Sequence, residues 1–340
     1  MKKIVIPKAG SYDRLILEEH EMPQPGLGEI RVAVAAAGVN YADCIVRMGL
    51  YESAKKYVGW PITPGFEVAG VVDALGDGVS DLNLGDPVIA STRFGGYTSH
   101  LVVPRNQVFK KPDCLSMEQA AAIPAVYLTA WFALHFLAHP REGDSILIHS
   151  AAGGVGGAAC QLARQAGCKS VGVVGASHKV DICQADVVID KSSQDLWAEA
   201  EKHAPKGYEV ILDANGVATL QQSYNHLAAP GKLVSYGFHT MMPKTGGKPN
   251  WIKLAIDYFR TPRFSPLDLT GRNRSVMGFN LSYLFNQADE LGMAMNELLT
   301  GFTTGALTPS PVTSYPLAEA GRAHADLESA QTVGKLVLIP

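Results

Sequence analysis

The stretch that decides the fold runs from Ser145 to Gly167 and reads SILIHSAAGGVGGAACQLARQAG. A short apolar run, Ile146 to Ile148, stops at a turn rich in glycine and alanine. Apolar residues then recur at helical spacing. Strand, tight turn and helix together form the context in which a glycine-rich turn binds phosphates. The stretch therefore predicts the opening unit of a nucleotide-binding sheet.

The turn follows the spacing of the dinucleotide fingerprint, Ala151-x-Gly153-x-x-Gly156, with alanine at the first position. Gly153 has no Cβ, so a pyrophosphate can approach its backbone, and Gly156 lets helix and strand pack closely. The N-terminus of the following helix offers free N–H groups and a partial positive charge. The alternative is a purely structural turn, because glycine-rich turns are common. The residues expected to contact cofactor are Ala152, Gly153, Gly154, Val155 and Gly156.

Length and composition fit a two-domain enzyme. The chain has 340 residues, of which 47% are hydrophobic and 18% charged, a balance typical of a well-packed protein. The formal net charge is −3 and neither end carries a polybasic block, so nucleic acid is not an expected partner. The five cysteines are odd in number and form no CxxC pair, which predicts reduced thiols and a cytoplasmic location.

Two segments bear on targeting and membranes. The N-terminal MKKIVIPKAG has a basic start but too few apolar residues before Pro7 for a signal peptide. Residues 119–140 contain no charged side chain and are long enough to span a bilayer. This segment also contains Pro124 and two histidines, and alanine is its commonest residue. We therefore expect a buried helix between the domains and no transmembrane segment.

The rest of the chain predicts an α/β fold. Residues 1–120 read as short strands separated by glycine and proline turns. Residues 121–260 alternate helix and strand, which predicts a doubly wound parallel sheet. A strand at 276–281, two helices and a strand at 335–339 complete the chain. We expect this closing strand to return to the first domain.

A basic segment interrupts the alternation of helix and strand. Residues 239–273 are poorly periodic, and residues 244–274 contain seven Lys or Arg and two Asp, a net charge of +5 (7 − 2). One interpretation is a solvated connector. The other is a docking surface for lipid or protein.

Several motifs occur in a fixed order over essentially the whole chain. They are GVNYAD (38–43), RMGLY (47–51), PITPGFEVAGVV (61–72), LGDPVIA (84–90), GGYTSHLVVP (95–104), SAAGGVG (150–156) and LES…GKLVLIP (327–340). Together they resemble the zinc-free quinone oxidoreductase (zeta-crystallin-like) branch of the medium-chain dehydrogenase/reductase superfamily. VMGFNLSYL and YPLAEAGRAHADLES look most like the vesicle amine transport protein homologues of that branch.

The resemblance implies a division into two domains. A GroES-like, β-rich catalytic domain is expected to comprise residues 1–122 and 270–340. A Rossmann NADPH-binding domain is expected to comprise residues 123–269.

The resemblance also implies a site without metal. Zinc-dependent relatives place a cysteine ligand where this chain has Asn40, and a histidine where it has Phe66. Amide and phenyl side chains cannot supply the thiolate and imidazole of a tetrahedral zinc site. The four-cysteine structural lobe of those relatives is also absent. Without a Lewis acid, alcohol oxidation loses its usual means of forming an alkoxide, which favours an electron-poor acceptor such as a quinone or an enone.

The choice of cofactor is read at the end of the second strand of the nucleotide domain. NAD enzymes place an acid there for the ribose 2′-OH, whereas this chain has Val174-Gly-Ala-Ser-His-Lys179. Ser177 and Lys179 can bind the 2′-phosphate of NADPH, which a carboxylate would repel. By resemblance, Lys179 matches a lysine of the family and Lys191 stands where relatives have a tyrosine. An arginine of the relatives has no counterpart near Ala330. Without the motif, Lys179 would be read as a surface lysine.

By resemblance, five further side chains lie near the nicotinamide or the acceptor. The Asn40 amide is expected to bond the carboxamide or a substrate carbonyl, unless it only stabilises its turn. Tyr51 is the candidate donor to a developing enolate or hydroquinone oxygen. Aromatic packing without chemistry is the alternative for Tyr51 and for Tyr41. Thr129 and Phe238 match positions near the cofactor, and their alternatives are a buried helix threonine and a core phenylalanine.

Two polar residues end predicted strands. Asp213 belongs either to a turn at the sheet edge or to the surroundings of the cofactor. His149 reads as a buried core histidine rather than a base. We find no Ser-His-Asp arrangement with triad context and no metal cluster.

The sequence therefore predicts a zinc-independent, NADPH-dependent oxidoreductase that acts on a quinone or an α,β-unsaturated carbonyl. The resemblance implies a homodimer. The alternative is a cofactor-binding protein with weak or no turnover, whose main role is docking to lipid or a partner through peripheral membrane contact.

Overall fold

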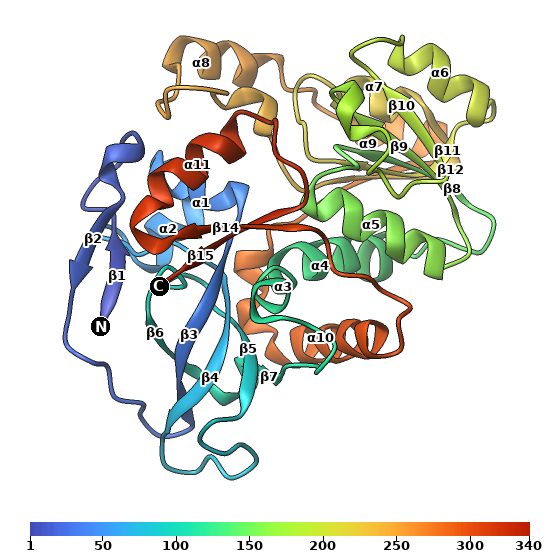
Figure 1. Cartoon of the computed structure of the whole chain (residues 1–340). Helices are drawn as coiled ribbons and strands as arrows, with labels where there is room; N and C mark the ends of the chain where they lie inside the picture. The colour runs from blue at the N-terminus through green and yellow to red at the C-terminus, as the bar shows by residue number, and fades with distance from the viewer. The chain divides into compact units, whose positions relative to one another are not determined.

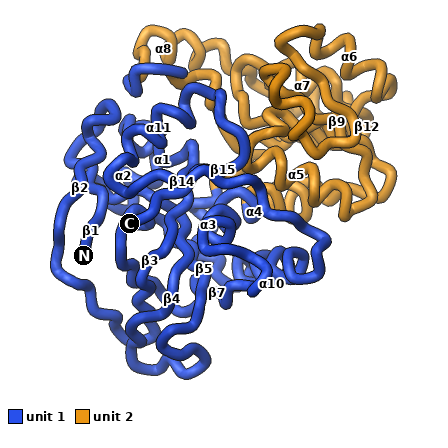
Figure 2. The backbone as a smooth tube through the Cα atoms, viewed as in Figure 1, with its two compact units in different colours: residues 1–128, 244–248, 281–340 blue, residues 129–243, 249–280 orange.

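The computed structural model describes every residue from Met1 to Pro340 (Figure 1). The chain divides into two compact units (Figure 2). Unit 1 comprises residues 1–128, 244–248 and 281–340, and unit 2 comprises residues 129–243 and 249–280. Each unit has its own sheet and its own hydrophobic core.

Unit 2 is built on a six-stranded parallel sheet in the order β10-β9-β8-β11-β12-β13. The strands are β8 (Ser145–His149), β9 (Lys169–Val174), β10 (Val187–Asp190), β11 (Tyr208–Asp213), β12 (Leu227–Ser235) and β13 (Arg274–Gly278). The connecting helices are α5 (Gly154–Gln165), α6 (Leu196–His203), α7 (Leu220–Asn225) and α9 (Pro266–Arg272). The strand order reverses beside β8, so this is the doubly wound sheet that the sequence predicts.

The strands of unit 2 form because parallel strands covered by helices bury their side chains on both faces. Ile146, Leu147 and Ile148 of β8 are all fully buried. Leu147 packs in one core cluster with Val173 and Ile211 of the neighbouring strands. The apolar run that opens the fingerprint is therefore the central strand of the sheet.

The basic segment contains two helices that the sequence analysis does not predict. They are α8 (Trp251–Arg260) and α9, and the expectation of poor periodicity is wrong for α8. Its apolar residues recur at helical spacing, but the helix is only ten residues long and lies between Pro249 and Pro262. β13 follows and pairs with β12, so the six-stranded sheet continues beyond the expected boundary at 269/270.

Unit 1 contains a seven-stranded sheet in the order β14-β15-β3-β4-β5-β7, with β6 paired to β3. The strands are β3 (Glu29–Val39), β4 (Glu67–Leu75), β5 (Pro87–Ser91), β6 (His100–Pro104), β7 (Val108–Lys110), β14 (Val312–Pro316) and β15 (Lys335–Ile339). The helices are α1 (Tyr41–Arg47), α2 (Glu52–Tyr57), α3 (Met117–Ala121), α10 (Ala288–Thr303) and α11 (Ala320–Glu328). The closing strand, β15, pairs antiparallel with β3, which confirms that the chain end returns to the first domain.

The uncharged segment at 119–140 is not one helix. It contains the end of α3, then α4 (Pro124–Trp131) and a π-helical stretch, Phe132–Ala138. Pro124 stands at the first position of α4, where its missing N–H costs no helical hydrogen bond, and so a new helix begins there. No helix of the chain combines the length and the apolar character needed to cross a bilayer.

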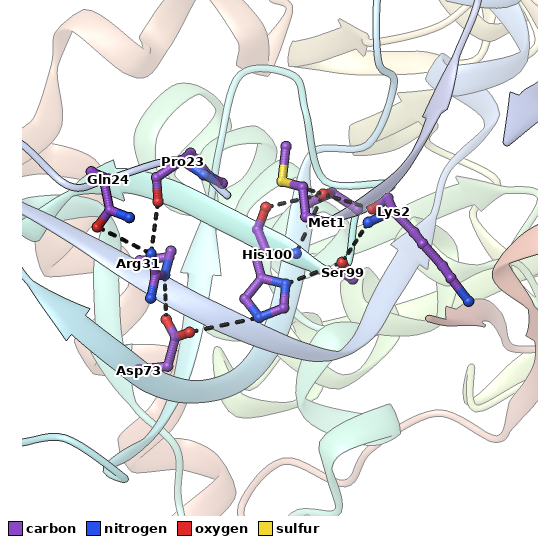
Figure 3. A network of polar contacts seen from close by, with 9 residues as sticks. Met1, Lys2, Pro23, Gln24, Arg31, Asp73, Ser99 and His100 are labelled. Atoms are coloured by element: carbon purple, nitrogen blue, oxygen red, sulfur yellow. Dashed lines mark hydrogen bonds and ion pairs between the residues drawn. The ribbon is translucent and has the colours of Figure 1, made fainter. Parts of the chain in front are cut away.

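A polar network joins the N-terminal hairpin, β1 (Lys2–Val5) and β2 (Ile16–Glu19), to the large sheet of unit 1 (Figure 3). Arg31 donates to the Asp73 carboxylate at 2.9 Å, and His100 lies 3.6 Å from the other oxygen of that carboxylate. Ser99 Oγ contacts the His100 ring at 3.1 Å and accepts from Lys2 N at 2.9 Å. Burial lowers the pKa of His100, so the ring serves as a neutral link.

Candidate functional site

The phosphate-binding turn leads directly from β8 into α5. Ser150 has a positive φ of 56°, and Gly153 N–H donates to Ser150 O at 2.9 Å. Gly153 is the N-cap of α5, and Gly157 N–H makes the first helical bond back to Gly153 O. The N–H groups of the first turn of α5 therefore have no partner within the helix.

The two fingerprint glycines leave room for different neighbours. A Cβ at Gly156 would lie 2.7 Å from Ala151 Cα, closer than real Cβ atoms come, so only glycine lets the helix approach the turn. A Cβ at Gly153 would lie 3.2 Å from Ser150 O and would fill the space at the start of the helix. Free N–H groups, a helix of twelve residues and an uncovered backbone fit the pyrophosphate of a dinucleotide.

The residues predicted to bind a 2′-phosphate follow two neighbouring strands. Ser177 and Lys179 come after β9, and Lys191 comes after β10, which pairs with β9 through Val174 and Asp190. A Cβ at Gly175 would lie 3.7 Å from Lys191 Cε, so the exposed Lys191 side chain passes over the end of β9. Lys179 is half-buried, and this burial lowers its pKa.

Asp190 is a carboxylate that the sequence analysis does not associate with this region. Its Oδ2 accepts from Ser177 Oγ at 2.6 Å and from Ser193 Oγ at 3.1 Å. Its Oδ1 accepts from the backbone N–H and the hydroxyl of Ser192. These bonds, with Ser177 as the largest contributor, lower the pKa of Asp190 to about 2. The end of β9 has no acid, as predicted, but its neighbour β10 brings one to Ser177.

Asp213 organises the turn after β11. Its carboxylate accepts from the N–H groups of Asn215 and Gly216, at 2.8 and 3.1 Å, and from two hydroxyls, Thr219 and Ser223, at 2.7 and 2.8 Å. His149 Nε2 lies 3.0 Å from Ser223 Oγ. His149 is fully buried, a setting that suits the predicted core histidine, and this burial lowers its pKa.

Asn215 is a second residue that the sequence analysis treats only as part of a turn. It is 1% exposed, and its Oδ1 accepts from Ser150 Oγ at 3.2 Å, which ties it to the phosphate-binding turn. Its Nδ2 is buried without a hydrogen-bond partner. Buried amide protons are rarely left unpaired, so this group fits an oxygen of a bound cofactor.

Phe238 and Thr129 are the other predicted cofactor contacts in unit 2. A Cβ at Gly216 would lie 2.6 Å from the Phe238 ring, so the ring covers the turn that begins at Asp213. Phe238 remains 42% exposed, which is unusual for a core phenylalanine. Thr129 lies half-buried on α4.

In unit 1, Asn40 belongs to a buried cluster of three polar side chains. Asn40 Nδ2 donates to Glu67 Oε1 at 2.8 Å, and Asn40 Oδ1 accepts from Lys335 Nζ at 2.7 Å. Lys335 Nζ also lies 2.7 Å from Glu67 Oε1 and donates to Val39 O at 3.0 Å. Glu67 Oε2 accepts from Ala125 N–H at the start of α4. Glu67 is fully buried and Lys335 is 4% exposed.

Gly38 makes space for this cluster. A Cβ there would lie 2.6 Å from the carboxyl carbon of Glu67 and would also collide with the backbone oxygen of Ala121. Gly38, two residues before Asn40, is therefore required because a larger residue would collide with the buried Glu67 carboxylate.

The donor set around Asn40 does not fit a zinc ion. The available groups are an amide, one carboxylate and an ammonium, and the ammonium already supplies the positive charge. At the second zinc position, Phe66 packs against Phe94 with ring centroids 5.5 Å apart. No group of three His, Cys, Asp or Glu side chains in the chain is arranged to hold a metal.

Tyr51 stands at the N-cap of α2 and joins the Phe66 cluster. Its ring lies 5.8 Å from that of Phe66 and 6.3 Å from that of Phe94, both edge to face. The ring is half-buried. This packing matches the alternative expectation for Tyr51, aromatic packing without a role in proton donation. It also holds the ring at a fixed angle. Burial raises the pKa of Tyr41 above its usual value, so Tyr41 keeps its proton.

A second buried network anchors α1, the helix that begins after Asn40. Asp43 accepts from Asn40 N–H, Gly65 N–H and the Tyr97 hydroxyl, at 2.8, 2.7 and 3.1 Å. The same hydroxyl lies 3.0 Å from His324 Nε2. Burial nevertheless raises the pKa of Asp43 to about 7. The network fixes the backbone of Asn40 independently of its side chain.

The other end of this network is an ion pair. Arg47 donates to Glu328 Oε1 at 2.7 Å, and both side chains are fully buried. Arg47 Nη1 lies 3.3 Å from His324 Nδ1. Arginine can only donate, so Nδ1 accepts and the proton of the neutral ring is on Nε2. The network links α1 to α11.

Comparison with known families agrees with this arrangement. Residues 26–113 match the family model described as alcohol dehydrogenase GroES-like domain. Residues 183–338 match the model described as zinc-binding dehydrogenase. A GroES-like unit joined to a Rossmann unit defines an NAD(P)-dependent oxidoreductase.

Individual relatives cover the whole chain. The Homo sapiens synaptic vesicle membrane protein VAT-1 homolog is 34% identical over 100% of this chain and 86% of its own length. The Lama guanicoe quinone oxidoreductase is 30% identical over 100% of this chain and 97% of its own. The Escherichia coli quinone oxidoreductase complexed with NADPH matches with a TM-score of 0.86 at 29% identity, over 100% of both chains. The chain belongs to the quinone oxidoreductase branch of the medium-chain dehydrogenase/reductase superfamily.

Two neighbouring glycines provide a test of the phosphate-binding turn. We expect Gly156→Ala to lower the free energy of unfolding by about 2 kcal/mol, because its Cβ forces α5 away from Ala151. Dinucleotide affinity should fall with it. Gly157→Ala is the matched control, since its Cβ has no neighbour closer than 3.9 Å. Chemical denaturation and calorimetric titration measure both effects, and equal behaviour of the two variants would contradict the close approach.

Proposed function

We propose that the chain is an NADPH-dependent reductase of quinones or α,β-unsaturated carbonyls that works without zinc. The observation that carries this proposal is the turn from Ser150 to Gly156, whose uncovered backbone and free helix N–H groups suit a pyrophosphate. A structural neighbour with this fold was crystallised with NADPH, which supports the same cofactor here.

Two lysines support NADPH over NADH. Lys179 and Lys191 follow the ends of adjacent strands and offer two cations to a 2′-phosphate. The Ser177 hydroxyl donates its one proton to Asp190, so it can donate to the phosphate only after that bond breaks. Asp190 opposes this assignment by its charge. Its carboxylate, however, already accepts four hydrogen bonds from serines, so it holds the Ser177 turn in place.

The chemistry follows from the groups near Asn40. NADPH, when bound, supplies the hydride. The Asn40 amide retains one N–H proton for a carbonyl oxygen, and the Tyr51 hydroxyl is the proposed donor to the reduced oxygen. The Asn40–Glu67–Lys335 cluster supports zinc independence, since its cation is an ammonium. A homodimer and a cytoplasmic location remain predictions.

Turnover tests this proposal directly. We expect the purified protein to oxidise NADPH, followed by its absorbance, with at least one member of a panel of quinones and enones. A zinc chelator should leave the rate unchanged, because the proposed site uses no metal. Tight NADPH binding without turnover of any acceptor would reject the reductase. A rate abolished by the chelator and restored by zinc would reject metal independence alone.

One observation favours a second function, docking to an anionic membrane surface. The helix α8 exposes its apolar residues: Trp251 (66%), Ile252 (76%), Ile256 (51%) and Phe259 (75%). The one buried side chain of α8 is instead a carboxylate: Asp257 is 7% exposed and pairs with Lys253, which also donates to Thr240 O.

The charges around α8 suit anionic lipid. Within the basic segment, Arg272 pairs with Asp268, and Arg274 donates to backbone carbonyls. Arg260, the last residue of α8, and Arg263 are exposed and form no ion pair. Apolar side chains beside unpaired cations are typical of helices that lie in a membrane interface. The related VAT-1 homologs are named as vesicle membrane proteins.

Vesicle binding tests the docking function. We expect co-sedimentation with phosphatidylserine-containing vesicles and weaker binding to neutral phosphatidylcholine vesicles. Replacing both Ile252 and Phe259 by Gln should reduce binding at least about tenfold, since each buried side chain contributes about 1.5–3 kcal/mol. Leu27→Gln, at an 83% exposed position of unit 1, is the control. If neither Ile252→Gln/Phe259→Gln nor Arg260→Gln/Arg263→Gln changes vesicle binding, α8 is excluded as the docking site.

A further inference from the structure

The register of the C-terminal strand brings Lys335 to Asn40. In the antiparallel pair of β15 and β3, Leu336 lies opposite Val39, so Lys335 stands across from Asn40. Lys335 Nζ contacts three oxygens: Val39 O, Asn40 Oδ1 and Glu67 Oε1, at 3.0, 2.7 and 2.7 Å. An ammonium group has three protons, so all of its donors are used within this cluster.

These contacts determine which way the Asn40 amide faces. Lys335 can only donate, and an ionised Glu67 can only accept. Asn40 Oδ1 must therefore face Lys335, at 2.7 Å, and Nδ2 must face Glu67, at 2.8 Å. The reversed amide would place N–H groups against the ammonium and an oxygen against the carboxylate. One Nδ2 proton remains after these bonds.

We propose that Lys335 is a positioning residue of the reductase: together with Glu67 it locks the Asn40 amide so that its remaining Nδ2 proton serves as a hydrogen-bond donor. The inference rests on the proposed function of Asn40. The ligand that this donor selects is a carbonyl oxygen, either of the acceptor or of the cofactor carboxamide. Lys335 acts through Asn40 and contacts no reacting atom.

Burial keeps the Asn40 amide in one orientation. The Lys335–Glu67 ion pair therefore has a role beyond stability. Removing two charges from water is expensive, and a buried ion pair often stabilises a fold no better than neutral residues of similar size. Its particular property is that neither partner can exchange donor for acceptor. Neutral amides at both positions could do so, and Asn40 would then adopt two orientations.

The matched variant is therefore Lys335→Gln/Glu67→Gln, which removes both charges together. We expect it to lower kcat/KM for a quinone or enone roughly ten- to hundredfold, because a misplaced contact group has effects of this size. Asn40→Ala should cause a similar loss. The triple variant should be no slower than Asn40→Ala alone, since Lys335 and Glu67 act through that amide. If the losses in kcat/KM of Asn40→Ala and of Lys335→Gln/Glu67→Gln multiply in the triple variant, the inference is overturned. Lys335 and Glu67 would then have a purely structural role.

A second measurement keeps the inference testable if the wild type reduces no acceptor. In protein labelled with ¹⁵N-asparagine, the Nδ2 signal of Asn40 should move in Lys335→Gln/Glu67→Gln. Arg31→Gln/Asp73→Asn, which neutralises a different ion pair of unit 1, should leave it in place. A shifted Asn40 signal without any turnover would refute the proposed function but support the claim that Lys335 and Glu67 orient the Asn40 amide. An unmoved signal would overturn the lock whatever the activity.

The single variant Glu67→Gln covers the case in which the double variant does not fold. It keeps Lys335 and its bond to Asn40 Oδ1, but replaces the carboxylate that accepts from Nδ2. The Asn40 signal should move here too. A folded Glu67→Gln protein with an unmoved signal would again overturn the lock.

Discussion

The contact between Lys335 and Glu67 holds together parts of unit 1 that are far apart in the sequence. Glu67 begins β4, Lys335 begins the closing strand β15, and Asn40 follows β3. The carboxylate also receives the N–H of Ala125 at the start of α4. Because the pair is buried, either charge alone would be strongly unfavourable, so these elements must come together as a set.

The same contact bears on the proposed zinc independence. The cation of the cluster is an ammonium group, which contacts Asn40 and Glu67. Asn40 is held twice, at its side chain by Lys335 and at its backbone by Asp43. A fixed amide donor suits a carbonyl acceptor that needs little activation, which agrees with the proposed quinone or enone.

The sequence predicts the fold well, and it predicts the strand, turn and helix of the proposed phosphate site because they are local. The stretch Ser145–Gly167 contains strand, turn and helix within a few residues, so its pattern is sufficient. Lys335 is 295 residues from Asn40, and Asp190 reaches Ser177 from a neighbouring strand. No local pattern reveals such contacts. The sequence does not predict α8 for a different reason: its helical spacing extends over only ten residues, between Pro249 and Pro262.

The cofactor preference is the most direct test of the account, because Asp190 and the two lysines favour different cofactors. Calorimetric titration of the wild-type protein should show NADPH binding at least about tenfold tighter than NADH, the effect of one charge-assisted contact or more to the 2′-phosphate. Equal affinities, or tighter binding of NADH, would contradict the account. Asp190 would then hold the ribose 2′-OH, and Ser177, Lys179 and Lys191 would not form a phosphate site.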